Sequence, residues 1–347
     1  MKKAFLGASV LTFAASAAFA GGIDRSGQGV NILFEEGDFA QFSFAAISPS
    51  VSGDGVFGPL DDVAKHYNTP SLGYKHSVNE NIDIAFIYDH PFGAHVYYPT
   101  IGGSGADISS EAYTGILRYK FDNGVSVYAG ARAAKVGGNI LSTPGYLEAD
   151  SNHGFGGLVG VSYEKPEIAM RVALTYNTGI TTDFEGFYVD PTASVHARAF
   201  DVEFPESVNL DFQTGIAKDT LIFGTVRWVG WDGFNLTTED GIEWVSFDDD
   251  TVTYSVGIGR QINSKLSLAL SAGYEKASSK ETTTLLAPTA GSSSIGIAAT
   301  YQINESLSIS GGLNYIWLGD TYFGAPGFVD FKDNTAIGAG VRIGMRF

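Results

Sequence analysis

Long segments of this chain alternate between apolar residues and small or polar ones, and this period of two is the feature that most constrains the fold. A β-strand points successive side chains to opposite faces, so each alternating segment has one apolar face and one small or polar face. The C-terminal segment shows the pattern most clearly, with these residues at every second position: Ile337, Ala339, Val341, Ile343, Met345 and Phe347. The alternation predicts an all-β protein, although a soluble β-sandwich would show it too.

The length of the predicted strands separates a membrane barrel from a sandwich. About fourteen alternating segments can be placed along the chain, most of them about 9–15 residues long, whereas strands average about 5–6 residues in soluble proteins. Short connections such as 121–124 alternate with long ones such as 182–201 and 232–250. Short turns at one rim and long loops at the other are typical of bacterial outer-membrane barrels. We therefore expect a transmembrane antiparallel β-barrel of about 14 strands over residues 39–347.

Composition excludes several classes of function. The net charge of −17 leaves no basic face for nucleic acid, and the absence of cysteine excludes disulfides and thiolate metal sites. The six histidines lack metal-ligand spacing, and neither a G-x-S-x-G elbow nor a phosphate-binding loop occurs. We expect no enzymatic activity, no metal and no cofactor.

The N-terminus predicts export. Lys2 and Lys3 precede an apolar stretch, and Ala18-Phe19-Ala20 forms an A-x-A cleavage signal, so residues 1–20 are interpreted as a signal peptide. The alternative, a retained transmembrane helix, fits less well because the segment is rich in small residues. We expect a multi-pass protein of the bacterial cell outer membrane, surrounded by lipid and lipopolysaccharide. The acidic run 248–250 in a predicted outer loop could bind a divalent ion there, but solvated loop charge is the simpler account.

Residues 21–38 precede the first strand and show no sustained alternation. One interpretation is a free periplasmic tail. The other is a hatch, meaning a plug folded into the barrel. The hatch residues would be Ile23, Val30, Asn31, Ile32, Leu33 and Phe34.

The predicted lumen face carries an unusual number of arginines. The alternation points these residues inward: Arg118, Arg132, Arg171, Asp211, Arg227, Arg342 and Arg346. The first five are candidates for holding a ligand head group, since a guanidinium binds a carboxylate bidentately. Alternatively, the arginines pair with Asp211 and with the hatch carboxylates Glu35 and Glu36. Segment 220–231 has apolar residues on both faces, which suits a hydrophobic ligand better than sugars or ions.

Three stretches resemble one known family. Segment 204–228, with its Phe204-Pro205-Glu206-Ser207 entry, and segments 42–53 and 84–98 are similar to strands of the outer-membrane long-chain fatty-acid transporter family, which includes aromatic-hydrocarbon uptake members. The resemblance implies a fourteen-stranded barrel closed by an N-terminal hatch. It also implies capture of ligand at the outer loops and sideways release at a kinked third strand. One departure concerns the hatch, where Asn31 is followed by Ile32 and Leu33 instead of the family's Asn-Pro-Ala.

The kink would lie at Asp89, His90, Pro91, Phe92 and Gly93. Proline cannot donate to a strand ladder, so Pro91 favours a break there independently of the resemblance. The simpler alternative is that Pro91 ends the strand at the rim.

These observations predict passive uptake of hydrophobic molecules, long-chain fatty acids foremost, with aromatic hydrocarbons as the other ligand class. We expect a single-chain barrel with no nucleic-acid partner. The alternatives are a general diffusion porin and a non-transporting structural or adhesive barrel. The sequence leaves open the chemical class of the ligand, the contacts of the arginines and how the hatch moves.

Overall fold

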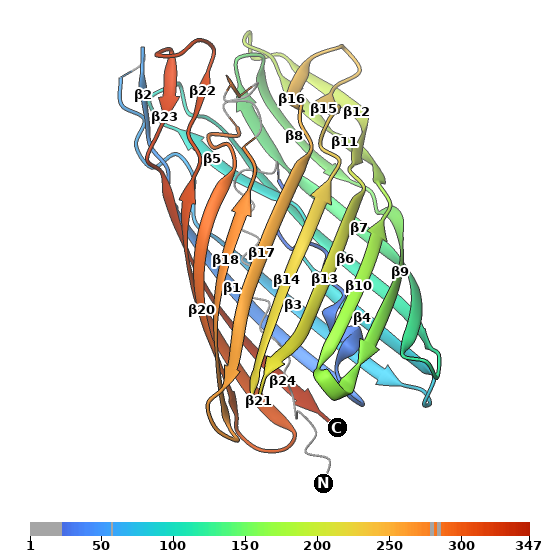
Figure 1. Cartoon of the computed structure of the whole chain (residues 1–347). Helices are drawn as coiled ribbons and strands as arrows, with labels where there is room; N and C mark the ends of the chain where they lie inside the picture. Colours follow the sequence, from blue (N-terminus) through green and yellow to red (C-terminus); the bar gives the residue numbers. More distant parts are fainter. Residues whose placement is uncertain (1–22, 57, 278–280, 283–285) are drawn as a thin grey trace.

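The computed structural model describes residues 23–56, 58–277, 281–282 and 286–347, so the expected signal peptide, 1–20, lies outside the described residues. The main sheet has eighteen strand segments and closes into a barrel (Figure 1). Closure comes from the pairing of the first segment with the last, from Phe39↔Arg346 to Ser50↔Thr335. The wall segments, in chain order, are β1 (Phe39–Ser50), β3 (Tyr67–Ser77), β4 (Ile82–Asp89), β5 (Gly93–Tyr98), β6 (Ser104–Lys120), β7 (Val125–Ser142), β8 (Gly145–Ser151), β9 (Gly154–Lys165), β10 (Met170–Asn177), β11 (Ile180–Val189), β12 (Val195–Phe204), β13 (Ser207–Ala217), β14 (Thr220–Val229), β17 (Thr251–Gln261), β18 (Leu266–Glu275), β20 (Ser292–Gln302), β21 (Leu307–Leu318) and β24 (Thr335–Arg346).

The expected antiparallel transmembrane barrel is confirmed, but the expected count of about fourteen strands differs from the eighteen segments observed. The difference arises because some strands of the wall are interrupted. Two consecutive segments then make up a single crossing of the barrel. β4 and β5 both pair with β6, and β8 and β9 both pair with β7. In the same way β11 and β10 pair with β12 and β13. Pro91 and Pro205 lie in two of these interruptions, and proline lacks the N–H that a ladder needs.

The outer face of the barrel is apolar. On β18, Leu268, Leu270 and Tyr274 are exposed, while the alternate positions Ala269, Ser271 and Gly273 face the lumen side. The same exposed apolar positions recur on β20, β21 and β24. A continuous apolar band around a closed barrel is the surface that a bilayer covers. Among the described residues, no helix is long and apolar enough to cross a membrane.

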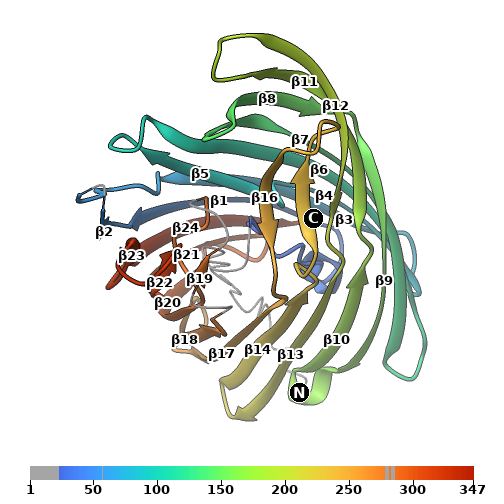
Figure 2. The same ribbon diagram turned by 90° about the horizontal axis from the view of Figure 1, so that it is seen from above.

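Short turns join the strands at the end where the C-terminus lies, and the long loops gather at the opposite end (Figure 1). Two small sheets form in these loops. One is the hairpin of β15 (Phe234–Thr237) and β16 (Glu243–Phe247); the other contains β2 (Gly53–Gly55), β19 (Glu281–Thr282), β22 (Thr321–Phe323) and β23 (Val329–Phe331). Seen from above, β16 lies across the mouth of the barrel (Figure 2). The turn between β9 and β10 carries the short helix η2 (Pro166–Ile168).

Candidate functional site

The described part of the segment before β1, residues 23–38, lies inside the barrel. It touches side chains from opposite sides of the wall, on β3, β6, β10, β13, β14 and β24, which only an internal segment can reach. Its 3-10 helix η1 (Asn31–Phe34) buries Ile32 and Leu33, which pack in one cluster with Val30, Ile116 and Leu158. This placement favours the hatch interpretation over a free tail.

A buried ion pair holds the beginning of this segment. Asp24 Oδ2 accepts a hydrogen bond from Arg227 Nε at 2.7 Å, and the two side chains are only 9% and 10% exposed. Arg227 also donates to Asn209 Oδ1 at 2.8 Å and to Ser207 Oγ at 3.1 Å, and the Asn209 amide donates to the carbonyl of Gly27. The hatch is therefore tied to β13 and β14 through a shared polar network.

An aromatic ring, Phe34, holds the hatch at its 3-10 helix η1. Phe34 lies between two guanidiniums, with the Cζ of Arg118 and of Arg171 at 4.6 and 4.5 Å from its ring centre. Arg118 also donates to the carbonyl of Leu33 at 2.9 Å and forms an ion pair with Glu164. These contacts are cation–π and charge-assisted interactions in a buried site.

The hatch ends at Asp38, at the rim where the short turns lie. Its carboxylate accepts hydrogen bonds from the Ser77 amide at 2.9 Å and from the His76 ring at 3.0 Å. The hydrogen bond from the Ser77 backbone amide, and then the one from the His76 side chain, lower the pKa of Asp38 because they stabilise the ionised carboxylate.

The barrel wall has a gap between β3 and the kinked strand β4–β5. Below the gap the ladder ends at Leu72↔Tyr88, and above it an isolated bridge joins Ala64 to Val96. The two pairs lie eight positions apart along each strand, so the register is the same on both sides of the gap. Between them, the described residues of β3 have no strand partner on this edge. Pro91 occupies the kink on one side and Pro70 stands on the other, and both lack an N–H.

The hatch supplies the hydrogen bonds that the gap lacks. The Arg25 amide donates to the carbonyl of Pro91 at 2.7 Å, and the Gly93 amide donates to the carbonyl of Ile23 at 2.8 Å. The Arg25 side chain adds a bond from Nε to the carbonyl of Gly93 at 2.7 Å. The kink itself is held by Ser110, whose hydroxyl accepts from the amide of Phe92 at 2.8 Å and donates to its carbonyl at 2.7 Å. The hatch thus pairs with the edge strand at the wall gap.

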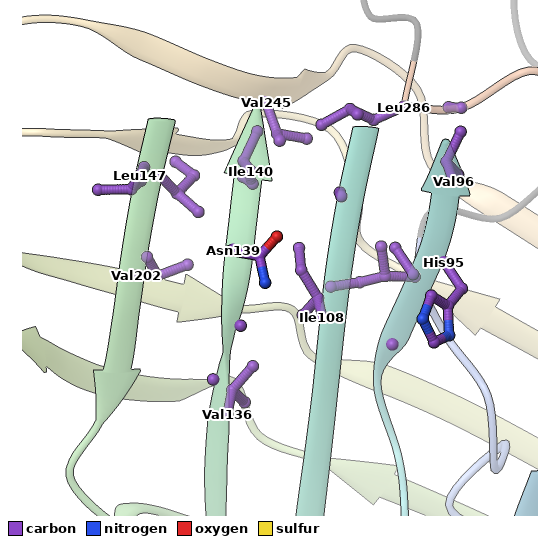
Figure 3. A pocket seen from close by; sticks show the side chains of 18 of the residues that line it. His95, Val96, Ile108, Val136, Asn139, Ile140, Leu147, Val202, Val245 and Leu286 are labelled. Atoms are coloured by element: carbon purple, nitrogen blue, oxygen red, sulfur yellow. The ribbon is translucent and has the colours of Figure 1, made fainter. Parts of the chain in front are cut away.

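An apolar cavity of about 80 Å³ lies above the hatch, towards the long loops. Figure 3 shows Val136, Ile140, Leu147 and Val202 around it, with Val245 and Leu286 approaching from the loops. Phe184 and Phe200, which stack at 5.2 Å between ring centres, also line it. Its few polar side chains include His95, Asn139 and Arg25. Such a lining suits a small apolar group or part of an alkyl chain.

Comparison with known proteins identifies the family. The family model described as outer membrane protein transport protein (OMPP1/FadL/TodX) matches residues 61–326, well over half of the chain. The chain belongs to this family. It is therefore an outer-membrane protein of a family that transports hydrophobic compounds, as the resemblance noted in the sequence implied.

Solved structures agree with this family at the level of the fold. A FadL homologue from Pseudomonas aeruginosa has a TM-score of 0.77 at 14% identity, covering 91% of this chain and 92% of that one. The toluene transporter TodX of P. putida has a TM-score of 0.65 at 12% identity, covering 96% and 94%. The monoaromatic hydrocarbon channel CymD has a TM-score of 0.62 at 14% identity, covering 90% and 89%. No curated protein matches the sequence.

The five lumen residues expected at a head group do not line the apolar cavity. Arg118, Arg171 and Arg227 contact the hatch, as described above. Arg132 donates to Thr114 Oγ1 at 2.9 Å and to Asn177 Oδ1 at 3.2 Å, and Asp211 accepts from Thr225 at 2.8 Å. These contacts favour the alternative in which the lumen arginines hold the hatch and the wall, with Asp24 as a hatch carboxylate that the sequence did not single out. Arg346 pairs with Glu36 at 3.4 Å.

The cavity lining was not anticipated from the sequence. Four of its residues belong to the β15–β16 hairpin, inside the long connection expected at 232–250: Phe234, Leu236, Val245 and Phe247. The sequence feature that could have indicated this lining is the high proportion of aromatic and apolar residues in 234–247. Within the described ranges, no group of three or more histidine or acidic residues is placed to hold a metal ion.

Proposed function

We propose that this protein mediates passive uptake of hydrophobic molecules, with long-chain fatty acids as the foremost ligand class and aromatic hydrocarbons as the other. Ligand is captured among the outer loops and enters the apolar cavity. The hatch then moves away from the kink at Asp89, His90, Pro91, Phe92 and Gly93, and the ligand leaves sideways into the membrane. The role involves transport with no chemical step and no cofactor.

One observation carries this proposal. The wall gap, the hatch and the apolar cavity adjoin one another, because Arg25 and Gly93 belong to the hatch–kink contact and also line the cavity. A ligand in the cavity is thus separated from the gap by the hatch segment around Ile23 and Arg25. If the ligand passes directly from the cavity to lipid, its apolar surface never enters water. Exposing that surface to water would cost about 25 cal/mol per Å².

A sideways route also explains why the hatch is held so firmly. A general diffusion porin needs an open aqueous lumen, whereas here the hatch is fixed by a buried ion pair, by backbone pairing and by the Phe34 contacts. We infer that the barrel acts as a single chain in outer-membrane lipid and lipopolysaccharide, with the hatch preventing leakage of polar solutes.

The test is uptake of a labelled long-chain fatty acid, and separately of labelled toluene, by cells that lack their own transporter. We expect the wild type to raise the uptake of at least one of them, and a variant with residues 89–93 replaced by a regular strand sequence to lose it while still inserting. If the cells take up neither compound and small sugars leak in, the result would refute the proposal and support the porin alternative. Unchanged uptake in the 89–93 variant would refute the sideways route alone.

A further inference from the structure

Trp231, which lies just after β14, is fully buried and leaves its indole N–H unused. Its side chain has no exposed surface, and within the described part of the chain its Nε1 has no hydrogen-bond partner. A buried tryptophan usually pairs this donor, because an unpaired donor has lost its hydrogen bonds to water and gained none in return. The orphaned donor therefore indicates a partner that the chain itself does not supply.

Two other tryptophans near the outer loops use the same group. Trp228 Nε1 donates to Asp250 Oδ2 at 2.9 Å, and Trp244 Nε1 donates to Thr238 Oγ1 at 3.3 Å. Trp244 is nearly as buried as Trp231, at 5% exposure. Burial in this part of the barrel is thus compatible with a paired indole, and Trp231 is the exception.

Aromatic rings pack against Trp231 and place it between the apolar cavity and the kink. Its ring meets those of Phe234 and Phe247 edge to face, at 5.2 and 5.3 Å between ring centres, and both of these residues line the cavity. It also meets the ring of Phe92, which belongs to the kink, at 6.4 Å. Phe204, which stacks on Phe92 at 4.6 Å, lines the cavity as well. A molecule that moves from the cavity towards the kink therefore passes beside Trp231.

The surroundings of this N–H define the chemistry of its partner. An indole N–H can only donate, so the partner is an acceptor such as a carbonyl, ether or hydroxyl oxygen. The neighbouring rings are uncharged, so a neutral oxygen costs less to bury among them than a carboxylate does. Ring faces are weak acceptors, so an entering oxygen displaces no strong hydrogen bond. The parallel rings of Phe184 and Phe200 in the cavity lining also suit a flat aromatic molecule.

We propose that Trp231 donates a hydrogen bond to the ligand on its way from the apolar cavity to the kink. Through this bond the protein selects aromatic molecules that carry a neutral oxygen acceptor, such as aromatic ketones, over plain hydrocarbons. The inference rests on the proposed function and refines its aromatic class of ligand. The ligand reaches Nε1 by displacing the rings of Phe234 and Phe247. The indole N–H then replaces the water that the oxygen lost on entering the barrel.

The first test compares acetophenone with α-methylstyrene, which has the same shape but a methylene group in place of the carbonyl oxygen. Equilibrium binding of both is measured on the purified barrel, in the wild type and in Trp231→Phe, which keeps an aromatic ring and removes the N–H. We expect the ratio of the acetophenone affinity to the α-methylstyrene affinity to fall about five- to thirtyfold, the effect of losing one buried hydrogen bond. Using the ratio cancels the smaller volume of phenylalanine.

Trp244→Phe is the matched control. It makes the same substitution at a buried tryptophan whose N–H already donates to Thr238. The two ligands should keep their wild-type affinity ratio in this variant, within about twofold.

The second measurement observes the donor in the wild-type protein. The chain has four tryptophans, so a barrel labelled with nitrogen-15 tryptophan gives four indole N–H signals in a nuclear magnetic resonance spectrum. The signal of Trp231 is the one missing from Trp231→Phe or, if that variant does not insert, the one left after the other three tryptophans are replaced in turn. Acetophenone should move its proton signal to lower field, as a new hydrogen bond does. α-Methylstyrene carries the same ring but no acceptor, and it should move the signal much less.

Equal weakening of both ligands in Trp231→Phe, or a Trp231 signal that moves alike with both, would overturn the donor role. If the wild type binds both ligands and either of these results is found, the donor role alone fails. If the wild type binds neither ligand and also takes up neither fatty acid nor toluene, the proposed function fails together with it.

Discussion

Replacing Arg227 should release the beginning of the hatch. Arg227 is the cation that balances the Asp24 carboxylate, and both side chains are about nine-tenths buried. In Arg227→Gln the carboxylate stays in the barrel without its partner. Breaking a buried ion pair by removing one member costs about 3–5 kcal/mol. If this whole cost weakens the docking of the hatch in the barrel, the population of the released hatch rises about 100- to 5,000-fold, at 1.36 kcal/mol per factor of ten.

The absence of cysteine gives a direct assay. Val30 is 1% exposed, and a single Val30→Cys substitution introduces the only thiol of the chain at a buried hatch position. When reclosing is fast, the rate of labelling by a water-soluble maleimide follows the population of the released hatch. We expect Arg227→Gln to raise this rate by at least a hundredfold in the Val30→Cys background.

Two comparisons make this result specific. In the double variant Asp24→Asn/Arg227→Gln no charge is left unpaired, so its labelling should be clearly slower than that of Arg227→Gln alone. Arg198→Gln removes an ion pair with Asp240 in the outer loops and should leave the rate within a few-fold of the parent. If Arg227→Gln labels as slowly as the parent, the ion pair does not hold the hatch and the reasoning fails.

Three further changes test the other contacts. Phe34→Leu removes the ring that contacts two guanidiniums and should speed Val30→Cys labelling about thirtyfold or more, since two desolvated cation–π contacts worth about 1–2 kcal/mol each are lost. Phe200→Arg puts a charge into the apolar cavity and should abolish uptake of labelled fatty acid while heat-modifiable gel mobility still reports a folded barrel. Because the pKa of Asp38 is lowered, its contribution to hatch docking is present above the ordinary carboxyl range and disappears as the pH falls through the lowered value. Labelling should therefore accelerate below about pH 4, and Asp38→Asn should show less of this pH dependence.

The period-two pattern was sufficient to predict the barrel. Segment 335–346 pairs along its full length with β1 and over residues 335–345 with β21, as its strict alternation predicts. The interruptions were only partly visible, because Pro91 and Pro205 mark two of them. Others fall at Asn152–His153 and Thr178–Gly179, where the chain contains no proline. There the break depends on how neighbouring strands bend together, which the local sequence does not record.

The partners of the lumen arginines could not be predicted. Alternation sets the face on which Arg227 lies, but its partner Asp24 is 203 residues away. Likewise, Phe184 and Phe200 lie within the connection expected at 182–201, but they are cross-strand partners in β11 and β12 and line the apolar cavity, and the hairpin 234–247 folds back over it. Such contacts follow from how the loops and the hatch fill the closed barrel. The motifs at 84–98 located the kink but not its pairing with the hatch.

The most direct test of sideways exit is to close the wall gap reversibly. Because the ladder has the same register on both sides of the gap, Ser71 and Asp89 would be the next pair after Leu72↔Tyr88. In the double variant Ser71→Cys/Asp89→Cys, a disulfide would join the two edges, and the reduced protein would serve as its own control. We predict that fatty-acid uptake falls to the level of cells without the protein on oxidation and returns on reduction. Uptake that persists while the disulfide is intact would contradict exit through the wall.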